Sequence, residues 1–397
     1  MLQWDEAGET RNAHWRSEAG VDAPRRVMVV DDSLSADAAY RLASEGTALL
    51  WRGDFQNARQ LLNALARRVD QKAERAVGKH KAPSGSAPGQ AGLSNAHPAM
   101  VSNAFNRHRL AQAQRARTLG MLLIPLDADY RIPLRRAPDL RTACAEAYGP
   151  GEDASSLPSA VSLRELLGLV GAHEWRKKGV AVAALGARVH PHYGVFAPVR
   201  GEYVGLVAEA PLPAGLQGNS LAFDIGTGTG VLAAVLAKRG VARVIATDQD
   251  ARSLACAREN LSRLGVAAQV EVVEADLFPP GRAPLIVCNP PWIPARPSAP
   301  IEYAIYDPES RMLRGFIAGL AAHLEPGGEA WLVLSDIAEH LGLRTRAELL
   351  KIFDEGGVNV VARSEVRPQH PRAADASDPL HAARAAEVTS LWRLILR

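Results

Sequence analysis

The stretch FDIGTGTG at residues 223–230 decides the fold of the second half of the chain. It follows a predicted buried strand at 220–224 and precedes a predicted helix at 231–239. Its three glycines let the backbone turn sharply between strand and helix and let a ligand approach without interference from Cβ atoms. The free N–H groups at the start of the helix suit a carboxylate or a phosphate. The stretch therefore predicts a ligand-binding loop between a strand and a helix.

Alternating strands and helices extend from this loop to the end of the chain. Further strands are predicted at 242–248, 269–275, 285–288, 330–335, 358–362 and 389–396, with helices at 250–264, 309–324 and 343–355. Asp250 is expected to cap the first of these helices. Such alternation indicates parallel pairing, and hence an α/β fold with a doubly wound, mostly parallel seven-stranded sheet. No helix separates the last two strands, so they are expected to form a closing antiparallel pair.

Acidic residues stand at the ends of the first three of these strands. Asp224 precedes the glycine loop, where it would repel a pyrophosphate but would suit the ammonium of an amino-acid ligand. Asp248 ends the second strand, in the place where open α/β sheets bind the hydroxyls of a ribose. Asp276 ends the third strand and is expected to accept the exocyclic amine of an adenine, with Leu277 and Phe278 flanking the ring. Together they indicate an adenosine-containing cofactor with an amino-acid part.

The glycine spacing also fits a dinucleotide-binding pattern. The segment from Gly228 to Ala233 matches G-x-G-x-x-G/A, and Asp248 lies 20 residues beyond Gly228. On glycine spacing alone, binding of NAD stays open. The carboxylate of Asp224 beside the loop favours the amino-acid-containing ligand.

The fourth strand ends in the tetrapeptide Asn289-Pro290-Pro291-Trp292. Two consecutive prolines fix φ and remove two N–H donors, which leaves a stiff loop with free carbonyl groups. The side-chain carbonyl of Asn289 and the backbone carbonyl of Pro290 can then accept both protons of one planar NH₂ group and direct its lone pair toward an electrophile. Trp292 offers a flat face to a base or an amide plane. This loop is therefore predicted to hold the acceptor nitrogen of a group transfer.

With these motifs in this order, residues 190–397 resemble the class I S-adenosylmethionine-dependent methyltransferases, which have a Rossmann-like fold. The resemblance is greatest to the amino-methylating branch, which includes HemK-type protein-glutamine methyltransferases, adenine-N6 enzymes and the small-domain guanine-N2 enzymes. The segment at 194–207 is similar to one that precedes the glycine loop in HemK-type enzymes, with counterparts at Pro198, Arg200, Glu202, Leu206 and Val207.

The resemblance assigns roles to the residues singled out above. It implies that S-adenosylmethionine is bound by Asp224, Gly226, Thr227, Gly228, Gly230, Asp248, Gln249, Asp276, Leu277, Phe278 and Asn289. It implies that the acceptor nitrogen is held by Asn289, Pro290, Pro291 and Trp292. Neither a metal nor a covalent nucleophile is expected, because this cofactor carries its own leaving group.

The N-terminal half has a different character. Residues 1–200 carry 27 basic and 20 acidic side chains, whereas residues 201–397 carry 19 and 23. Most of the basic excess lies at 51–141, with 16 basic against 6 acidic residues. We expect a flexible arm at 1–25, then a mainly helical substrate-recognition domain at 26–190 with a linker or loop at 83–98, and the catalytic domain at 191–397. Within the helical domain, a short strand is predicted at 26–30 and amphipathic helices at about 35–50 and 55–76.

Composition excludes several classes of protein. The three cysteines lie far apart, so neither a disulfide framework nor a structural zinc site is supported. The N-terminus lacks the apolar region of a secretory signal, and no apolar run is long enough for a membrane span. A cytoplasmic location without membrane association is therefore expected.

The hypothesis with the most support is an S-adenosylmethionine-dependent N-methyltransferase that acts on a macromolecule. The segment at 194–207 favours a protein glutamine amide, such as one in a translation factor. The basic region at 51–141 favours an adenine-N6 or guanine-N2 position in RNA or DNA. A binding module that has lost turnover is the third alternative, and the intact Asn289–Trp292 loop argues against it. The sequence leaves the oligomeric state open.

Overall fold

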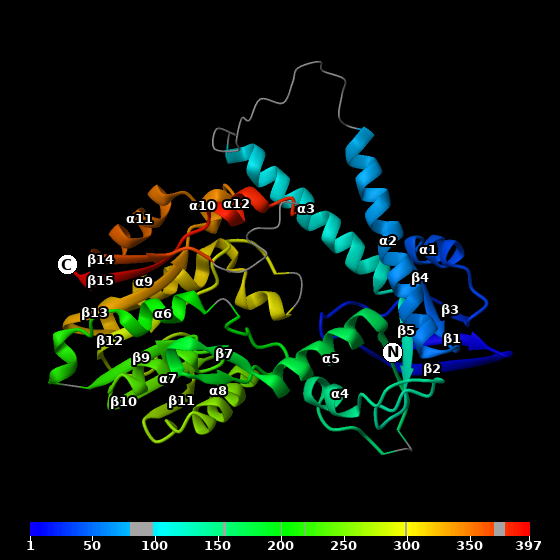
Figure 1. Cartoon of the computed structure of the whole chain (residues 1–397), viewed down its shortest axis with the longest axis horizontal. Helices are drawn as coiled ribbons and strands as arrows, with labels where there is room; N and C mark the ends of the chain where they lie inside the picture. The colour runs from blue at the N-terminus through cyan, green and yellow to red at the C-terminus, as the bar shows by residue number, and fades with distance from the viewer. Residues whose placement is uncertain (80–97, 154–155, 200, 219, 298–299, 369–377) are drawn as a thin grey trace. The chain divides into compact units, whose positions relative to one another are not determined.

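The computed structural model describes the 397-residue chain except for residues 80–97, 154–155, 200, 219, 298–299 and 369–377. The chain divides into two compact units (Figure 1). The N-terminal unit comprises Met1–Ser94 and Asn106–Glu174, and the C-terminal unit comprises Asn95–Phe105 and Trp175–Arg397. The C-terminal unit thus begins before the predicted boundary at 190. The predicted linker at 83–98 lies outside the described residues, apart from Pro98.

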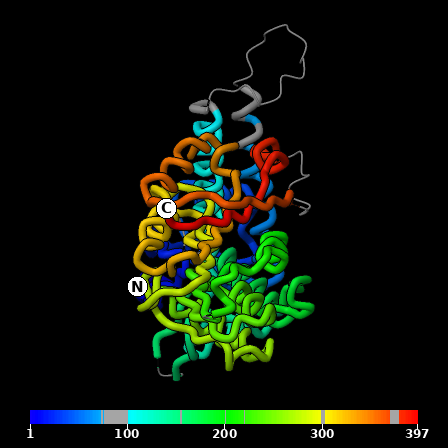
Figure 2. Tube along the Cα trace, turned by 90° about the vertical axis from the view of Figure 1, so that its left-hand side faces the viewer, coloured from blue at the N-terminus to red at the C-terminus, as the bar shows by residue number. Residues whose placement is uncertain are grey.

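The C-terminal unit is built on a seven-stranded sheet. Its strands are β9 (Leu221–Ile225), β10 (Arg243–Asp248), β11 (Val270–Glu274), β12 (Ala283–Cys288), β13 (Leu324–Ser335), β14 (Val358–Val366) and β15 (Thr389–Leu396). They are paired in the order β11-β10-β9-β12-β13-β15-β14. β15 is antiparallel to β13 and β14, while the pairs from β11 to β13 are parallel. Figure 2 shows the orange-to-red traces of β14 and β15 side by side. The predicted doubly wound sheet with a closing antiparallel pair is confirmed, but the prediction that no helix separates the last two strands is wrong, because residues 381–386 form a short helix between them.

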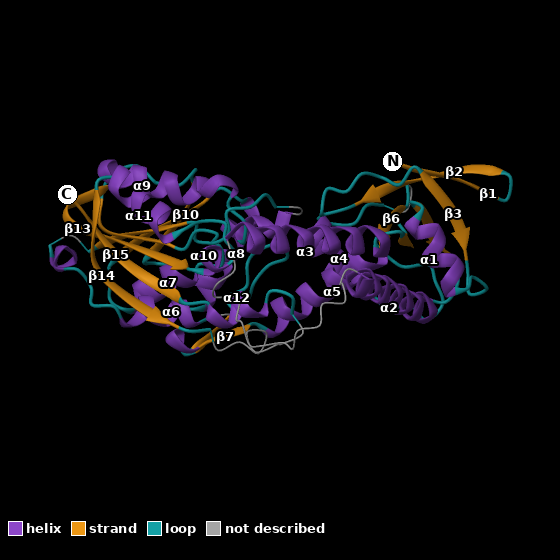
Figure 3. Ribbon diagram, turned by 90° about the horizontal axis from the view of Figure 1, so that it is seen from above, coloured by secondary structure: helices purple, strands orange, loops and turns teal. Residues whose placement is uncertain are grey.

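Helices cover both faces of this sheet (Figure 3). One face carries α6 (Glu202–Glu209), α7 (Val231–Lys238) and α8 (Ala251–Arg263), and the other carries α9 (Arg311–His323) and α11 (Arg346–Glu355). Side chains alternate along each strand, so Ala222 packs in the first layer and the adjacent Phe223 in the second. The glycine loop and the Asn289–Trp292 loop follow β9 and β12, and so meet at the carboxyl edge of the sheet.

Smaller elements complete the C-terminal unit. They are β7 (Val180–Val182), β8 (Ala187–Val189), α10 (Ile337–His340), α12 (His381–Ala386) and short 3-10 turns at Ala183–Leu185, Ala214–Gln217, Pro300–Ala304 and Pro308–Ser310. Across the described ranges of both units, every helix is too short or too polar to cross a bilayer.

The N-terminal unit has its own six-stranded mixed sheet. The strands are β1 (Leu2–Glu6), β2 (Glu9–Arg16), β3 (Arg26–Val30), β4 (Thr47–Trp51), β5 (Leu122–Leu126) and β6 (Ser159–Ser162), in the order β1-β2-β6-β5-β4-β3. The helices are α1 (Ala36–Ser44), α2 (Phe55–Lys79) and α4 (Arg141–Tyr148), together with α3 (Pro98–Leu119) and α5 (Leu163–Lys178), whose residues are divided between the two units.

The prediction of a flexible arm at 1–25 is wrong. β1 and β2 form an antiparallel hairpin that continues the sheet through the parallel pairing of β2 with β6. Leu2, Trp4 and Ala13 point to one face of the hairpin and are buried against Leu50 and Leu123. The polar residues between them face outward, so the overall composition concealed a strand with a period of two.

The prediction of a mainly helical domain at 26–190 is also corrected, because it omitted the central sheet. The strand at 26–30 and the helix at 55–76 were predicted, but the second half of the helix expected at 35–50 is β4. All five residues of β4 and all five of β5 are buried. Buried runs this short show no alternation, so their periodicity does not separate a strand from a helix.

Candidate active site

The loop between β9 and α7 contains three glycines in the left-handed region. Their φ angles are 71° at Gly226, 53° at Gly228 and 80° at Gly230. A Cβ atom on Gly226 would lie 2.6 Å from Cε of Met312, and one on Gly230 would lie 3.3 Å from Cα of Ala257. A Cβ atom on Gly228 would have no atom of the described residues within 4 Å. Gly226 and Gly230 therefore permit close packing, while the space beside Gly228 is open to a ligand.

Asp224 lies beneath this loop and is only 1% exposed. Its Oδ2 atom accepts hydrogen bonds from the Thr227 hydroxyl at 2.6 Å and from the Ala233 N–H at 3.0 Å. Burial raises the pKa of Asp224 to about 6, and the nearby charge of Asp248 contributes to this increase. The carboxylate thus fixes the loop and the first turn of α7. Its expected contact with an ammonium group remains a prediction.

Asp248 connects the carboxyl ends of β9 and β10. Its Oδ2 atom accepts from the Gly228 N–H and its Oδ1 atom from the Asp250 N–H, each at 3.0 Å. Burial raises the pKa of Asp248 above its usual value. Asp250 caps α8 through the Ser253 N–H at 2.8 Å, as expected, and Gln249 is exposed beside it. The carboxylate of Asp248 is therefore fixed by the backbone N–H groups of Gly228 and Asp250.

Asp276 and Leu277 follow β11 at the same edge. The carboxylate of Asp276 is exposed and lies 3.3 Å from the guanidinium of Arg311 in α9. Leu277 has a φ of 73°, and its carbonyl accepts from the Thr247 hydroxyl at 2.6 Å. These contacts fix the backbone after β11 and leave the Asp276 carboxylate accessible, so its assignment to an adenine amine stays a prediction.

Phe278 lies differently from what the sequence suggested. Its ring stacks on His323 with a centroid distance of 4.5 Å and an interplanar angle of 2°, and it also stacks on Phe316. A Cβ atom on Gly319 of α9 would collide with the same ring. The described contacts of Phe278 are therefore packing contacts with α9, and they give no support to the expected contact with an adenine ring.

The Asn289–Trp292 loop has an internal hydrogen bond at its centre. The indole Nε1–H of Trp292 donates to Oδ1 of Asn289 at 2.9 Å. Pro290 is buried, whereas Pro291 and Trp292 are half-buried. The Asn289 side chain also interacts with the phenol of Tyr203 in α6 and opposes the increase in its pKa. The loop is thus tied both to itself and to the helix that packs beside α7.

Tyr203 was not singled out from the sequence, although it lies within the segment at 194–207. It is 4% exposed, and burial together with the charge of Asp224 raises the pKa of its phenol. Of the counterparts expected in this segment, Glu202 begins α6 and Val207 is buried in the core, whereas Arg200 lies outside the described residues. Tyr203 therefore lies between the glycine-loop carboxylate and the Asn289 loop.

Asp307 is a second residue that the sequence analysis missed. It is 5% exposed, and its carboxylate accepts from the N–H groups of Met312 at 2.9 Å and Leu313 at 3.2 Å. Its own N–H donates to the carbonyl of Ile293 at 2.8 Å. Burial raises the pKa of Asp307. The residue couples the start of α9 to the segment that follows Trp292, and an aspartate followed by Pro308 before a helix was the available signal.

Asn260 is a third such residue, and it lies in the middle of α8. Its Nδ2 atom donates to the carbonyl of Thr229 in the glycine loop at 3.1 Å, and its Oδ1 atom accepts from the His190 N–H at 2.7 Å. The side chain is 1% exposed. A single asparagine in a helix gives no sequence signal for this role, which depends on a partner 70 residues away.

The structure thus brings Asp224, Gly228, Asp248 and Asn289 to one edge of the sheet. Asp224 lies in β9, which pairs with β10 on one side and with β12 on the other. The arrangement offers buried carboxylates and an open glycine beside a side-chain amide. Among the described residues, no group of three or more His, Cys, Asp or Glu side chains is placed to hold a metal ion.

Comparison with known proteins agrees with this arrangement. Residues 188–365 match the family model of the methyltransferase small domain. A release factor glutamine methyltransferase of Cereibacter sphaeroides is 39% identical over 123 residues, which are 28% of this chain and 44% of that protein. A tRNA1(Val) (adenine(37)-N6)-methyltransferase of Bacteroides thetaiotaomicron is 28% identical over 164 residues, which are 39% of this chain and 68% of that protein.

The similarity is confined to part of each protein. The chain spans less than half the length of the release factor relative. The solved structure of a ribosomal protein L11 methylase from Lactobacillus delbrueckii covers 50% of this chain and 79% of its own, with 18% identity and a TM-score of 0.33. The seven-stranded sheet and the residues that match the family model, 188–365, both lie in the C-terminal unit. Residues 188–365, which lie in the C-terminal unit, are therefore similar to the methyltransferase small domain, in agreement with the resemblance of their motifs.

Proposed function

We propose that this protein transfers the methyl group of S-adenosylmethionine to a planar amino nitrogen of a macromolecule. One observation carries the proposal: Oδ1 of Asn289 accepts the N–H of a planar ring, the indole of Trp292, at 2.9 Å. The carbonyl oxygen is thus placed at the carboxyl edge of the sheet with an N–H donor in front of it. An amino group that displaced the indole N–H would meet the same acceptor.

The residues around Gly228 fit the parts of the cofactor. When bound, S-adenosylmethionine supplies a methyl group on a sulfonium, which carries its own leaving group. A buried carboxylate gains from pairing with a cation, so Asp224 is assigned to the ammonium of the methionine part. Asp248 accepts two backbone N–H groups and retains lone pairs for two hydroxyls, so it is assigned to the ribose. Asp276 and Leu277 are assigned to the adenine.

The Asn289 loop positions the nucleophile. The Asn289 side-chain carbonyl and the Pro290 backbone carbonyl each accept a hydrogen bond from one N–H of the amino group. These two hydrogen bonds turn the nitrogen lone pair toward the methyl group. Pro290 and Pro291 fix the backbone, so this geometry is formed before the acceptor binds. Trp292 then gives up its hydrogen bond to Asn289 and offers its ring as a flat surface for the acceptor.

A protein glutamine amide is the first candidate acceptor. It is supported by the segment at 194–207 and by the similarity to a release factor glutamine methyltransferase. A base amine in nucleic acid is the second candidate. It is favoured by the longer match to a tRNA adenine-N6 methyltransferase, which covers 39% of the chain, and by the basic region at 51–141. Both acceptors present the planar amino group that the Asn289 loop requires.

The experiment that tests the proposal is incubation of the protein with cell extract and methyl-labelled S-adenosylmethionine. Label that protease removes supports the first candidate, and label that nuclease removes supports the second. Asn289→Ala removes the acceptor oxygen and is expected to abolish labelling, whereas Trp292→Phe keeps a flat ring and is expected to retain it. Unchanged labelling by Asn289→Ala would contradict the proposal.

A second measurement separates the cofactor hypotheses. Calorimetric titration is expected to show binding of S-adenosylmethionine and none of NAD, because the carboxylate of Asp224 lies beneath the loop that would receive a pyrophosphate. Binding of NAD without binding of S-adenosylmethionine would overturn the assignment of the glycine loop.

A further inference from the structure

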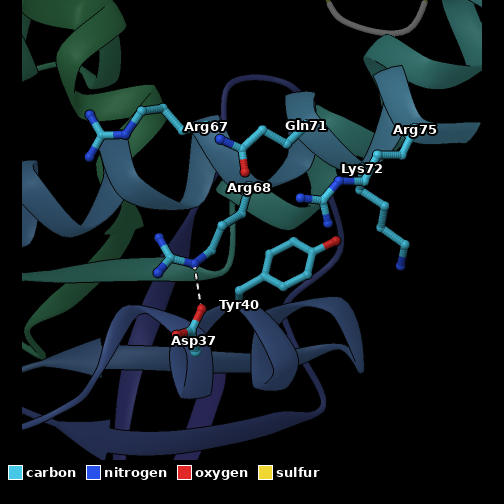
Figure 4. Close-up of a pocket in the computed structure, with 7 residues that line it drawn as sticks. All are labelled: Asp37, Tyr40, Arg67, Arg68, Gln71, Lys72 and Arg75. Atoms are coloured by element: carbon cyan, nitrogen blue, oxygen red, sulfur yellow. Dashed lines mark hydrogen bonds and ion pairs between the residues drawn. The ribbon is translucent and has the colours of Figure 1, made fainter. Parts of the chain in front are cut away.

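A basic groove lies between α1 and α2 of the N-terminal unit, and we call it the α1–α2 groove (Figure 4). It has a volume of about 510 Å³. The side chains that line it include Asp37 and Tyr40 from α1 and Arg67, Arg68, Lys72 and Arg75 from α2. These residues lie outside the segment that matches the methyltransferase small domain. The groove is therefore a feature that the catalytic unit does not explain.

More positively than negatively charged side chains line the groove. Arg68 donates to Asp37 at 2.7 Å, which pairs one positive with the one negative side chain. Arg67 and Arg75 are exposed and form no ion pair with any side chain that the structure describes. Lys72 is also exposed, and its ammonium lies 5.9 Å from the ring centroid of Tyr40. Three cations in this groove are therefore available to an anionic partner.

The acid of α2 whose side chain the structure describes, Asp70, does not cancel this charge. Asp70 of α2 is held by Arg115 of α3 at 2.8 Å, on a different side of the helix from the groove. Burial of the pair is partial, and the pKa of Arg115 is raised by its hydrogen bond to Asp70. Asp70 therefore does not neutralise the positive charge that the groove presents to solvent.

The spacing of the cations suits a chain of phosphates. The three available cations, Arg67, Lys72 and Arg75, all line the groove and extend over eight residue steps of α2, so they form a stripe about 12 Å long beside it. Phosphates recur along a nucleic acid strand about every 3.4 Å of a double helix, and farther apart when the strand is stretched. The stripe can therefore face more than one phosphate of the same strand.

Tyr40 adds a second kind of contact. Its side chain lies between those of Arg68 and Lys72 in the groove (Figure 4). An aromatic ring among cations is typical of surfaces that track a single strand, since bases stack on the ring while cations bind the backbone. The groove volume lies within the range of about 300–1,000 Å³ for small-ligand sites. A volume of this size admits an unpaired nucleotide.

We propose that the α1–α2 groove binds single-stranded nucleic acid, with Arg67, Lys72 and Arg75 on phosphates and Tyr40 stacked on an unpaired base. This inference does not rest on the proposed methyl transfer, because every residue in it lies in the N-terminal unit. Failure of the methyl-transfer assay would leave nucleic acid binding intact, and the reverse also holds.

The test is fluorescence anisotropy of the full chain with a labelled oligouridine and the matching oligodeoxyuridine, over a range of salt concentrations and without cofactor. Arg67→Gln with Arg75→Gln is expected to weaken binding about tenfold or more. It is also expected to reduce the slope of log K against log salt by about 1.4, which is about 0.7 for each lost phosphate contact. Tyr40→Leu is expected to weaken binding about fivefold or more with an unchanged slope.

The control is Arg59→Gln with Arg164→Gln, which removes the same charge from exposed positions outside the groove. It is expected to change the affinity less than twofold. Equal losses in groove and control variants would overturn the proposal, as would equal competition by a polyglutamate of the same charge. Preference for the ribose or the deoxyribose strand identifies the partner as RNA or DNA, and either result supports the proposal.

Discussion

The candidate active site of the C-terminal unit and the α1–α2 groove of the N-terminal unit place their polar groups in opposite ways. In the C-terminal unit, Asp224 and Asp307 are 1% and 5% exposed, and each is held by N–H groups at the start of a helix. In the N-terminal unit, Arg67 and Arg75 stand exposed on the surface of α2. A buried group with fixed partners holds a reacting atom in one geometry, whereas exposed cations suit a polyanion whose position is less strictly defined.

This contrast indicates a division of labour between the units. The proposed chemistry depends on accurate positions of the side chains at the carboxyl edge of the seven-stranded sheet. The proposed docking depends on the number and spacing of charges on α2. Substitutions in the two units are therefore expected to differ in the size and the kind of their effects.

The largest effect is expected at Asn289. Asn289→Ala removes the carbonyl oxygen that accepts the Trp292 N–H, and with it the proposed contact to the acceptor nitrogen. We expect methyl transfer to fall by about 10²–10³-fold, the usual loss for one preorganised hydrogen-bonding group in an active site. Transfer from labelled S-adenosylmethionine measures this effect. The assay is run at saturating cofactor, as established by calorimetry, because the resemblance also assigns Asn289 to the cofactor site.

A smaller effect is expected from loss of a buried amide outside the acceptor loop. Asn260→Ala leaves the His190 N–H and the Thr229 carbonyl without their buried partner, which is expected to lower the free energy of unfolding by about 2–3 kcal/mol. Urea-induced unfolding measures the change. The matched substitution Asn63→Ala, at an exposed position of α2, is expected to cost less than about 0.5 kcal/mol. Similar decreases in the free energy of unfolding for the two variants would contradict the expected difference between the units.

The next effect is on the pH dependence of cofactor binding. Burial raises the pKa of Asp224 to about 6, so the carboxylate is ionised above that pH and becomes neutral as the pH falls through it. A neutral side chain cannot pair with the cofactor ammonium, so affinity for S-adenosylmethionine is expected to be about tenfold weaker at pH 5 than at pH 7. Asp224→Asn is expected to bind weakly at both values. A profile of the same steepness in that variant would assign the titration to another group.

The smallest effect is expected on stability in the N-terminal unit. Arg67→Gln and Arg75→Gln remove exposed charges that form no ion pair with a described side chain, so each is expected to change the free energy of unfolding by less than about 0.5 kcal/mol. Urea-induced unfolding of the two variants measures the change. A loss above about 1.5 kcal/mol would show that these residues hold the unit together, and would remove the distinction between docking and structural positions.

The sequence predicted the C-terminal unit well because its signals are local. The glycines of the β9–α7 loop, the cap at Asp250 and the acids at strand ends each constrain the backbone around them. The N-terminal sheet was missed because β4 and β5 are buried runs of five residues with no alternation. Their identity as strands depends on pairing with each other and with distant segments.

The candidate site divides in the same way. Asn289 and Asp248 were predicted from motifs and lie at the expected edge of the sheet. Asn260 was missed because its partner is 70 residues away, and Tyr203 because its role depends on contact with a different loop. The packing of Phe278 against His323 of α9 is not visible in the sequence, and the assignment of Phe278 to an adenine stays a prediction.

The most direct test of the central claim is the position of the methyl group in the product. The labelled macromolecule is digested to amino acids or nucleosides, and the methylated residue is identified by mass spectrometry against synthetic standards. We expect the methyl group on a planar amino nitrogen, either the side-chain amide of glutamine or the exocyclic amine of adenine or guanine. A methyl group on oxygen, carbon, sulfur or a ring nitrogen would contradict the role assigned to Asn289.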